Sequence, residues 1–171
     1  MYQNETYYLW LTPEETMAET FRVVIRRLSR EYKSRLFQPH VTLASGIRGQ
    51  EKDLISKTYN LASKISGFTV QPKEFAYRDE FYRAFFIAIK PEKQLLEANL
   101  VARQIFDLSE HNDYMPHLSL FYGNLPVREK DKIKQQLDVK LLRPFKLANL
   151  VLFCTDFQTD DWYPVESVKL D

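Results

Sequence analysis

The chain has 171 residues, 44% of them hydrophobic and 27% charged, a composition typical of one ordinary globular domain. Its 24 basic and 23 acidic residues nearly cancel, whereas proteins that bind a long nucleic-acid backbone have a basic excess. The single cysteine, Cys154, excludes an internal disulfide and a thiolate metal cluster within one chain. The first residues lack the pattern of a signal peptide, and no apolar run is long enough for a membrane span. We therefore expect a cytoplasmic monomer with no membrane association, which acts on a small substrate or on the short end of a larger one.

The first half of the chain alternates strands and helices. Aromatic and apolar residues predict a strand at 6–11, and Thr12, Pro13 and Glu15 have the spacing of a helix start with a capping box. The helix should end near residue 34. The patterns that follow predict a strand at 39–44, a helix at 51–65, and two strands at 68–77 and 81–89.

The second half repeats this order. A helix is predicted at 92–108, with Leu95, Leu96 and Leu100 in its apolar face, followed by a strand at 118–123 and a polar surface helix at 128–137. Two further strands are predicted at 147–153 and 165–170. Two similar runs of helices and short strands indicate an α+β or α/β domain with internal pseudo-symmetry.

Two decapeptides of the chain resemble each other. Residues 37–46 read F-Q-P-H-V-T-L-A-S-G, and residues 114–123 read Y-M-P-H-L-S-L-F-Y-G. Pro, His, Leu and Gly recur at the same offsets, an aromatic residue leads both, and Thr42 corresponds to Ser119. The two segments contain two of the three histidines of the chain. We interpret them as an internal repeat of a functional site.

Strand periodicity gives this repeat a chemical meaning. Residues i and i+2 of a strand point to the same face, so His40 and Thr42 share a face, as do His117 and Ser119. If the two halves pack about a pseudo-twofold axis, the imidazoles face each other across a cleft. One neutral histidine can then accept a proton while the other donates one, and the hydroxyls can donate hydrogen bonds to phosphate oxygens. The residues between them should pack against helices: Val41, Leu43, Leu118 and Leu120.

The H-V-T and H-L-S segments resemble the two motifs of the two-histidine (2H) phosphoesterase superfamily, whose signature is a pair of H-x-[ST]-x sequences. The two decapeptides, the YYLWLTP start and the FYRAFFIAIKP segment are most similar to its cyclic phosphodiesterase (CPDase) branch, so the resemblance covers most of the chain. It implies a LigT-like α+β fold over residues 1–171, as one domain of two pseudo-symmetric lobes. Two antiparallel sheets would lie side by side, with helices on their outer faces and the active cleft between the lobes.

The resemblance also implies an activity. The branch hydrolyses 2′,3′-cyclic nucleotides, or ADP-ribose 1″,2″-cyclic phosphate, a by-product of tRNA splicing, to a phosphomonoester. It assigns acid–base catalysis to His40 and His117 and phosphate binding to Thr42 and Ser119. We expect neither a metal nor another cofactor.

Aromatic residues are expected around the same cleft. The branch tends to have a tyrosine three residues after the second hydroxyl, and Tyr122 stands there as a further substrate-binding candidate. Strict alternation would turn Tyr122 away from His117, so a twist or bulge near Gly123 has to bring it in; an ordinary core role is the alternative. Trp10 and Tyr82 are candidates for stacking on a base.

Other interpretations remain open at this point. An RNA-end enzyme of the 2′–5′ RNA ligase or phosphodiesterase type would act on a terminal 2′,3′-cyclic phosphate of RNA 3′ ends and would be sensitive to salt. A nucleotide-binding module would keep the fold without turnover. A zinc site would need a carboxylate beside the two histidines, but the chain has no HxH or HxxxH pair. The remaining polar candidates have plain structural interpretations. His111 is expected in a solvated loop and Cys154 as an inert buried thiol. The cluster Arg26, Arg27 and Arg30 is expected on the solvent-exposed face of its helix.

Overall fold

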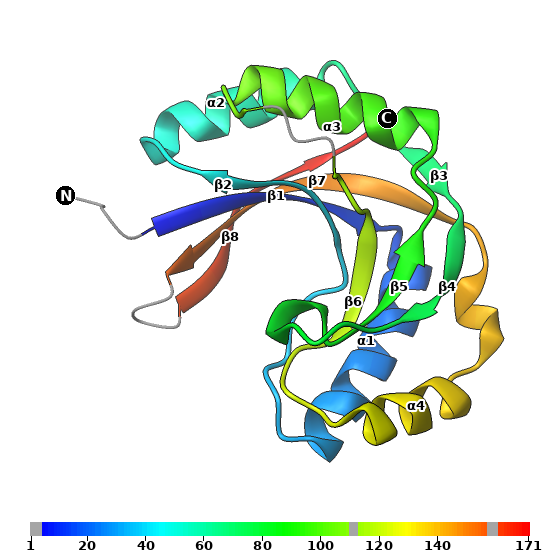
Figure 1. The fold of residues 1–171 in the computed structure, drawn as a ribbon. Helices are drawn as coiled ribbons and strands as arrows, with labels where there is room; N and C mark the ends of the chain where they lie inside the picture. The colour runs from blue at the N-terminus through cyan, green and yellow to red at the C-terminus, as the bar shows by residue number, and fades with distance from the viewer. Residues whose placement is uncertain (1–4, 110–112, 157–160) are drawn as a thin grey trace.

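The computed structural model describes residues 5–109, 113–156 and 161–171 and shows an α+β fold (Figure 1). In chain order the elements are β1 (Glu5–Pro13), α1 (Glu15–Glu31), β2 (Val41–Ile47), α2 (Glu51–Ala62), β3 (Phe68–Val70), β4 (Pro72–Ala76), the 3-10 helix η1 (Phe81–Arg83), β5 (Phe85–Ile89), α3 (Lys93–Ile105), β6 (His117–Phe121), α4 (Val127–Gln136), the 3-10 helix η2 (Val139–Leu142), β7 (Phe145–Asp156) and β8 (Asp161–Lys169). Within the described residues no helix is both long and apolar enough to cross a bilayer.

The strands form one antiparallel sheet. Its order is β3-β7-β1-β2-β6-β5-β4, with β8 beside β7. The two expected sheets are therefore joined edge to edge, through a pairing of β2 with β6 that registers at Val41 and Leu118 alone. Such a short contact divides the sheet into two groups of strands. The first group contains β1, β2, β3, β7 and β8, and the second contains β4, β5 and β6. The two groups diverge on either side of the contact, which opens space between them.

The sheet curls until its two ends come close together. β3 and β4 stand at opposite ends of the strand order, yet only Gln71 separates them along the chain (Figure 1). The single strand predicted at 68–77 is thus wrong, since β3 pairs with β7 while β4 pairs with β5. Pro72 lacks an N–H for a further strand, which suits the first residue of the terminal strand β4. The curl gives the sheet a convex and a concave side.

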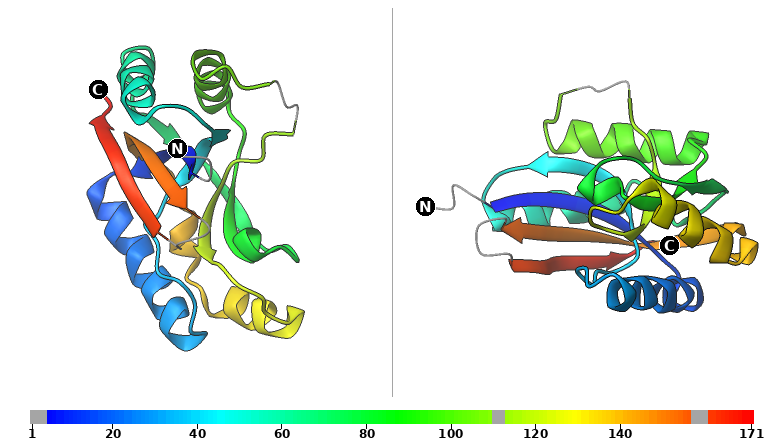
Figure 2. Two further views of the ribbon diagram at one scale, coloured as in Figure 1. Left: turned by 90° about the vertical axis from the view of Figure 1, so that its left-hand side faces the viewer. Right: turned by 60° about the horizontal axis from the view of Figure 1, so that its bottom comes forward.

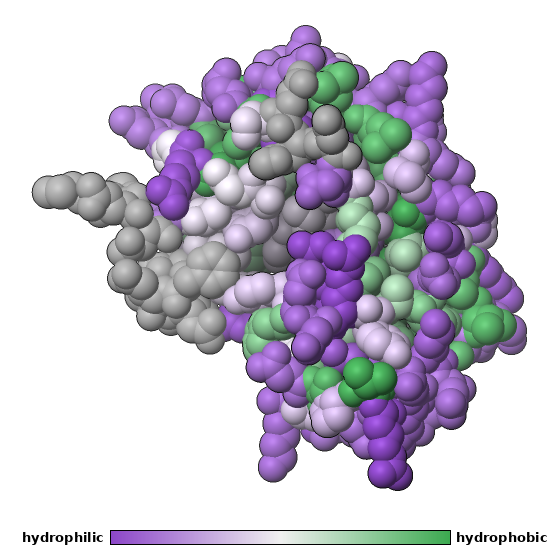
Figure 3. Space-filling model, in the orientation of Figure 1, coloured by the Kyte–Doolittle hydropathy of each residue, from purple (hydrophilic) through white to green (hydrophobic). Residues whose placement is uncertain are grey.

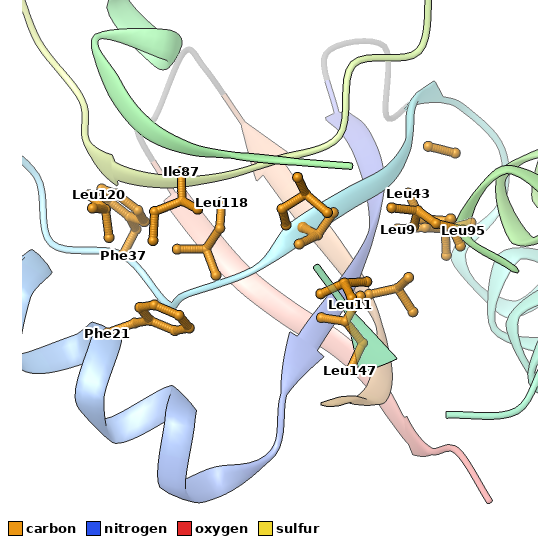
Figure 4. Packing of buried hydrophobic residues seen from close by; sticks show 14 of the residues in the cluster. Leu9, Leu11, Phe21, Phe37, Leu43, Ile87, Leu95, Leu118, Leu120 and Leu147 are labelled. Carbon is orange, nitrogen blue, oxygen red and sulfur yellow. The ribbon is translucent and has the colours of Figure 1, made fainter. Parts of the chain in front are cut away.

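Helices cover the convex side (Figure 2). α2 and α3 pack on one group of strands, against β7, β8 and β2, whereas α1 packs against β1 and β6. Leu9 of β1 and Leu43 of β2 lie beside Leu95 of α3, and Phe21 of α1 lies near Leu118 of β6 (Figure 4). All five side chains are at most 1% exposed. The predicted burial of Val41, Leu43, Leu118 and Leu120 is confirmed.

Strand alternation in β1 divides the core from the concave face. Tyr7, Leu9 and Leu11 are buried in the main core, as the period of two requires. Tyr8 and Trp10 point the other way, toward the concave side, where Trp10 packs in a separate small cluster. The start of α1 differs from the prediction: Thr12 continues β1, and its hydroxyl accepts a hydrogen bond from Asn149 instead of capping the helix.

Candidate active site

A cleft of about 410 Å³ lies on the concave side, between the two groups of strands. Both sequence repeats line it, so the structure brings together all five predicted site residues: His40, Thr42, His117, Ser119 and Tyr122. The space-filling view shows pale side chains of intermediate hydropathy gathered in this hollow (Figure 3). This mixture of aromatic and weakly polar groups is typical of a site for a small ligand.

The β2–β6 contact explains how the two motifs meet. Val41 pairs with Leu118, and each of these residues directly follows a motif histidine. In an antiparallel pair, the residue before one partner lies toward the residue after the other. His40 therefore lies toward Ser119, and Thr42 toward His117, on the face opposite the buried Val41 and Leu118. The predicted strand at 39–44 starts late, because His40 precedes β2 by one residue.

The two imidazoles are held in the same way. His40 Nδ1 lies 2.7 Å from the carbonyl oxygen of Gln38, and His117 Nδ1 lies 2.9 Å from that of Met115. In each repeat a proline separates histidine and carbonyl and fixes the backbone between them. A carbonyl only accepts, so each neutral imidazole carries its hydrogen on Nδ1 and leaves Nε2 bare for chemistry.

Aromatic rings pack around His40. Trp10 stacks on the imidazole with ring centroids 3.5 Å apart and 8° between the planes. Phe153 covers the other face of the indole at 3.7 Å. Trp10 has no open face for a base, so the base-stacking role considered for it is wrong. Tyr82 remains suited to that role, because its ring lines the cleft and is 45% exposed.

Burial decides the charge of both histidines. Desolvation lowers the pKa of His40 to about 3, and repulsion from His117 acts in the same direction against the Gln38 carbonyl. The pKa of His117 is also lowered, chiefly by burial and further by Arg83 and Arg78. Both imidazoles are therefore neutral at pH 7 in the absence of a ligand, because a buried cation without a counter-charge is unfavourable.

Tyr122 reaches the cleft because β6 ends before it. The strand stops at Phe121, and Gly123 follows with a φ of 142°, a value that favours glycine. The Gly123 N–H donates to the carbonyl of Phe81 at 2.9 Å, which holds the turn. The expected departure from alternation near Gly123 is present, as a strand end. The Tyr122 ring stacks on Phe37, with centroids 3.9 Å apart.

Three hydroxyl groups line the floor of the cleft. Ser119 Oγ donates to the Tyr82 carbonyl over 3.3 Å, which is longer than a good O–H···O bond. Burial raises the pKa of the Tyr122 phenol, which stays protonated as a hydrogen-bond donor. The Thr42 hydroxyl makes no hydrogen bond within the described part of the chain. Thr42 and Ser119 can thus turn toward a bound anion at little cost.

The leading aromatic residue of each repeat contacts the other repeat. Phe37 of the first segment stacks on Tyr122 of the second, and the Tyr114 hydroxyl of the second donates to the carbonyl of Thr42 in the first at 2.9 Å. Both residues stand three positions before the motif histidine. The recurrence of an aromatic there was visible in the sequence, but its reciprocal contact was not predicted.

Charged and amide side chains also line the cleft wall, and the sequence patterns did not predict them. Asn99 and Arg103 of α3 line the cleft, as do Arg83 of η1 and Asp113. Their positions depend on how α3 and η1 pack, for which the sequence held no local signal. Among the described residues no group of three His, Cys, Asp or Glu side chains lies close enough to hold a metal ion. His111 lies outside the described residues.

Comparison with known proteins identifies the family. The model of the family described as cyclic phosphodiesterase-like protein matches residues 6–170. A cyclic phosphodiesterase of Arabidopsis thaliana is 25% identical over 158 residues, which cover 90% of this chain and 87% of that protein. Escherichia coli LigT in its apo form superimposes with a TM-score of 0.63 at 14% identity over 97% of both chains, and LigT complexed with 3′-AMP with 0.60 at 13% over 98% and 99%. These two likenesses concern the fold. The chain belongs to the cyclic phosphodiesterase-like family of 2H phosphoesterases and is a hydrolase of the phosphodiesterase type.

Proposed function

We propose that this hydrolase opens a small cyclic phosphodiester, a 2′,3′-cyclic nucleotide or ADP-ribose 1″,2″-cyclic phosphate, to a phosphomonoester without a metal ion. His40 and His117 serve as the acid–base pair, Thr42 and Ser119 bind the phosphate, and Tyr122 supports them. The name of the Arabidopsis relative supports a cyclic phosphodiester as the bond that is cleaved.

One observation carries this proposal: the two motif histidines present the same reactive atom to one cleft. Each Nδ1 is bound to the carbonyl two residues earlier, and each Nε2 is left bare. Two such nitrogens, one from the residue before β2 and one from the first residue of β6, can serve one phosphorus atom from its two sides. A histidine buried for structural reasons alone would use both nitrogens in hydrogen bonds within the protein.

The reaction needs one proton on the pair. Water attacks phosphorus, the neutral imidazole takes a proton from the water, and the P–O bond to one ribose oxygen breaks. The protonated imidazole gives its proton to that oxygen, so the pair ends with its roles exchanged. Because burial lowers both histidine pKa values, the substrate anion has to raise the pKa of one of them as it binds.

Hydroxyl donors stabilise the charge that develops on the phosphate. Thr42 and Ser119 flank the histidines across the β2–β6 pair, so a phosphate between the imidazoles lies within reach of both. The weak Ser119–Tyr82 bond is exchanged for a shorter bond to an anionic oxygen, which is about twice as strong as a neutral one. The Tyr122 phenol lines the same cleft and stays protonated, so it can supply a further donor to the phosphate.

Hydrolysis in EDTA tests the proposal. Adenosine 2′,3′-cyclic phosphate and ADP-ribose 1″,2″-cyclic phosphate are incubated with wild type, His40→Ala and His117→Ala, and the products are resolved by chromatography. We expect turnover by wild type and a loss of about 10²- to 10⁴-fold in kcat for each variant. Thr42→Val and Ser119→Ala should each lower kcat by about tenfold or more, since each removes one donor to the phosphate.

The same experiment separates the other candidate functions. Wild type that leaves both small substrates intact but opens a terminal cyclic phosphate on short RNA is an RNA-end enzyme. Wild type that binds the cyclic nucleotide and leaves it intact for hours is a binding module, and the catalytic proposal is then wrong. Turnover that EDTA abolishes and added metal restores contradicts the metal-free mechanism.

A further inference from the structure

Arg103 has an unusual position in the cleft wall. It belongs to the last turn of α3 and lines the cleft together with Asn99, which lies one helical turn earlier. Its Nε atom is buried and has no hydrogen-bond partner among the residues that the structure describes. A guanidinium group is always charged, and a buried donor on such a group costs free energy when it has no acceptor. The position suggests that a ligand supplies the acceptor.

The neighbours of Arg103 place it away from the histidines. Asn99 Nδ2 donates to the Leu43 carbonyl at 2.7 Å, which anchors α3 one residue beyond Thr42 in β2. Arg103 stands one turn later, about 6 Å further along the helix axis. Ser45, three residues after Thr42 in β2, also lines the cleft. The cleft therefore extends beyond the position of the reacting phosphate, and Arg103 lies on that extension.

The other charges of the cleft do not neutralise Arg103. Arg83, the second cleft-lining arginine, forms an ion pair with Glu80 at 3.0 Å. Asp113 is exposed, and within the described residues it forms no ion pair with Arg103. With both histidines neutral, Arg103 carries a positive charge in the cleft that forms no ion pair with any described carboxylate. An arginine in that state favours a phosphate group, whose oxygens match the fork of its N–H donors.

We propose that Arg103 forms a second anion subsite, so that the preferred substrate carries a second phosphate group besides the cyclic one. This inference rests on the proposed function for its first phosphate. The second phosphate can be a 5′-phosphomonoester, the diphosphate of ADP-ribose or the preceding phosphodiester of RNA. All three offer the guanidinium the same anionic phosphate oxygens. A nucleoside 2′,3′-cyclic phosphate without such a group leaves Arg103 unused.

A comparison of substrates tests the subsite. Wild type and Arg103→Gln are assayed with adenosine 2′,3′-cyclic phosphate, its 5′-phosphorylated form, ADP-ribose 1″,2″-cyclic phosphate and a dinucleotide with a terminal cyclic phosphate. For at least one of the last three, we expect Arg103→Gln to lower kcat/KM about tenfold or more, mainly through KM. Adenosine 2′,3′-cyclic phosphate should change less than about twofold, which also shows that the variant folds. The substrate with the largest loss identifies the source of the second phosphate.

Arg26→Gln is the matched control. It makes the same change of charge on the outer face of α1, where Arg26 is exposed beside Arg27 and Arg30. We expect Arg26→Gln to leave kcat/KM unchanged for all four substrates. Equal losses on every substrate with Arg103→Gln, or no loss on any, overturn the subsite. Losses with Arg26→Gln that match those of Arg103→Gln show a general effect of charge and overturn it as well.

Equilibrium binding separates this inference from the proposed function. Calorimetry with adenosine 3′,5′-bisphosphate and adenosine 3′-monophosphate needs no turnover. We expect Arg103→Gln to raise the Kd of the bisphosphate about tenfold and to leave that of the monophosphate unchanged. If wild type hydrolyses nothing but this difference is present, the subsite stands and the hydrolytic function is wrong. If wild type hydrolyses its substrates but the difference in Kd is absent, the hydrolytic function stands and the Arg103 subsite is wrong.

Discussion

Burial of His40 makes the folded state sensitive to acid. The pKa of this imidazole is lowered to about 3 in the folded chain, whereas an unfolded histidine has a pKa of about 6.5. Well above pH 6.5 the imidazole is neutral in both the folded and the unfolded chain, so its protonation does not change the free energy of unfolding. As the pH falls below that value the unfolded state gains a proton that the folded state does not accept, so stability is lost.

The size of the loss at pH 5 follows from the unfolded pKa. At pH 5 the folded imidazole is still neutral, and the unfolded one lies about 1.5 pH units below its pKa, which is worth about 2 kcal/mol. Urea unfolding of wild type and His40→Asn at pH 7.5 and at pH 5 measures this term. Carboxylates contribute equally to both proteins, so we expect wild type to lose about 2 kcal/mol more than the variant. Equal losses in the two proteins would refute the burial of a neutral His40.

Three further outcomes are expected. Because both histidine pKa values are lowered, the singly protonated free enzyme becomes rare above pH 6.5, so kcat/KM should fall about tenfold per pH unit from there to pH 8; a plateau over that range contradicts this. Tyr114→Phe removes the bond to the Thr42 carbonyl and should cost about 1 kcal/mol of stability, together with a fall in kcat larger than any change in KM. The buried residues of both groups of strands form one cluster, so urea unfolding followed by fluorescence and by circular dichroism should give one coincident transition, and two separate transitions would argue against one domain.

Local patterns predicted the elements that depend on local sequence. The strand predicted at 6–11 and the helix predicted after it are such cases, and in α1 Phe21, Ile25 and Leu28 are buried at helical spacing. The motif histidines were found for a different reason: the site is duplicated, and a duplicated site leaves two copies of one pattern in the chain. That signal located both halves of the cleft without any knowledge of how they pack.

The packing of elements that are distant in sequence was not predictable. Leu96 and Leu100 were expected in the apolar face of α3 but are 42% and 45% exposed. α3 instead turns Ala98, Asn99 and Ala102 inward, because small side chains let it approach β2 closely and Asn99 finds the Leu43 carbonyl there. This rotation of the helix also turns Arg103 toward the cleft. The missed cleft residue and the wrongly predicted helix face thus have one cause.

The two halves of the site are symmetric in sequence, yet their surroundings differ. Trp10 lies opposite Thr42 in β1, and Phe86 lies opposite Ser119 in β5, so the two aromatic residues occupy equivalent places. Trp10 stacks flat on His40 at 3.5 Å, whereas Phe86 meets the ring of His117 edge-on at 5.1 Å and 61°. The flat stack excludes water from one whole face of His40, and that histidine is the more deeply buried of the two. In the proposed acid–base pair, the indole therefore adds to the desolvation that lowers the pKa of His40 to about 3.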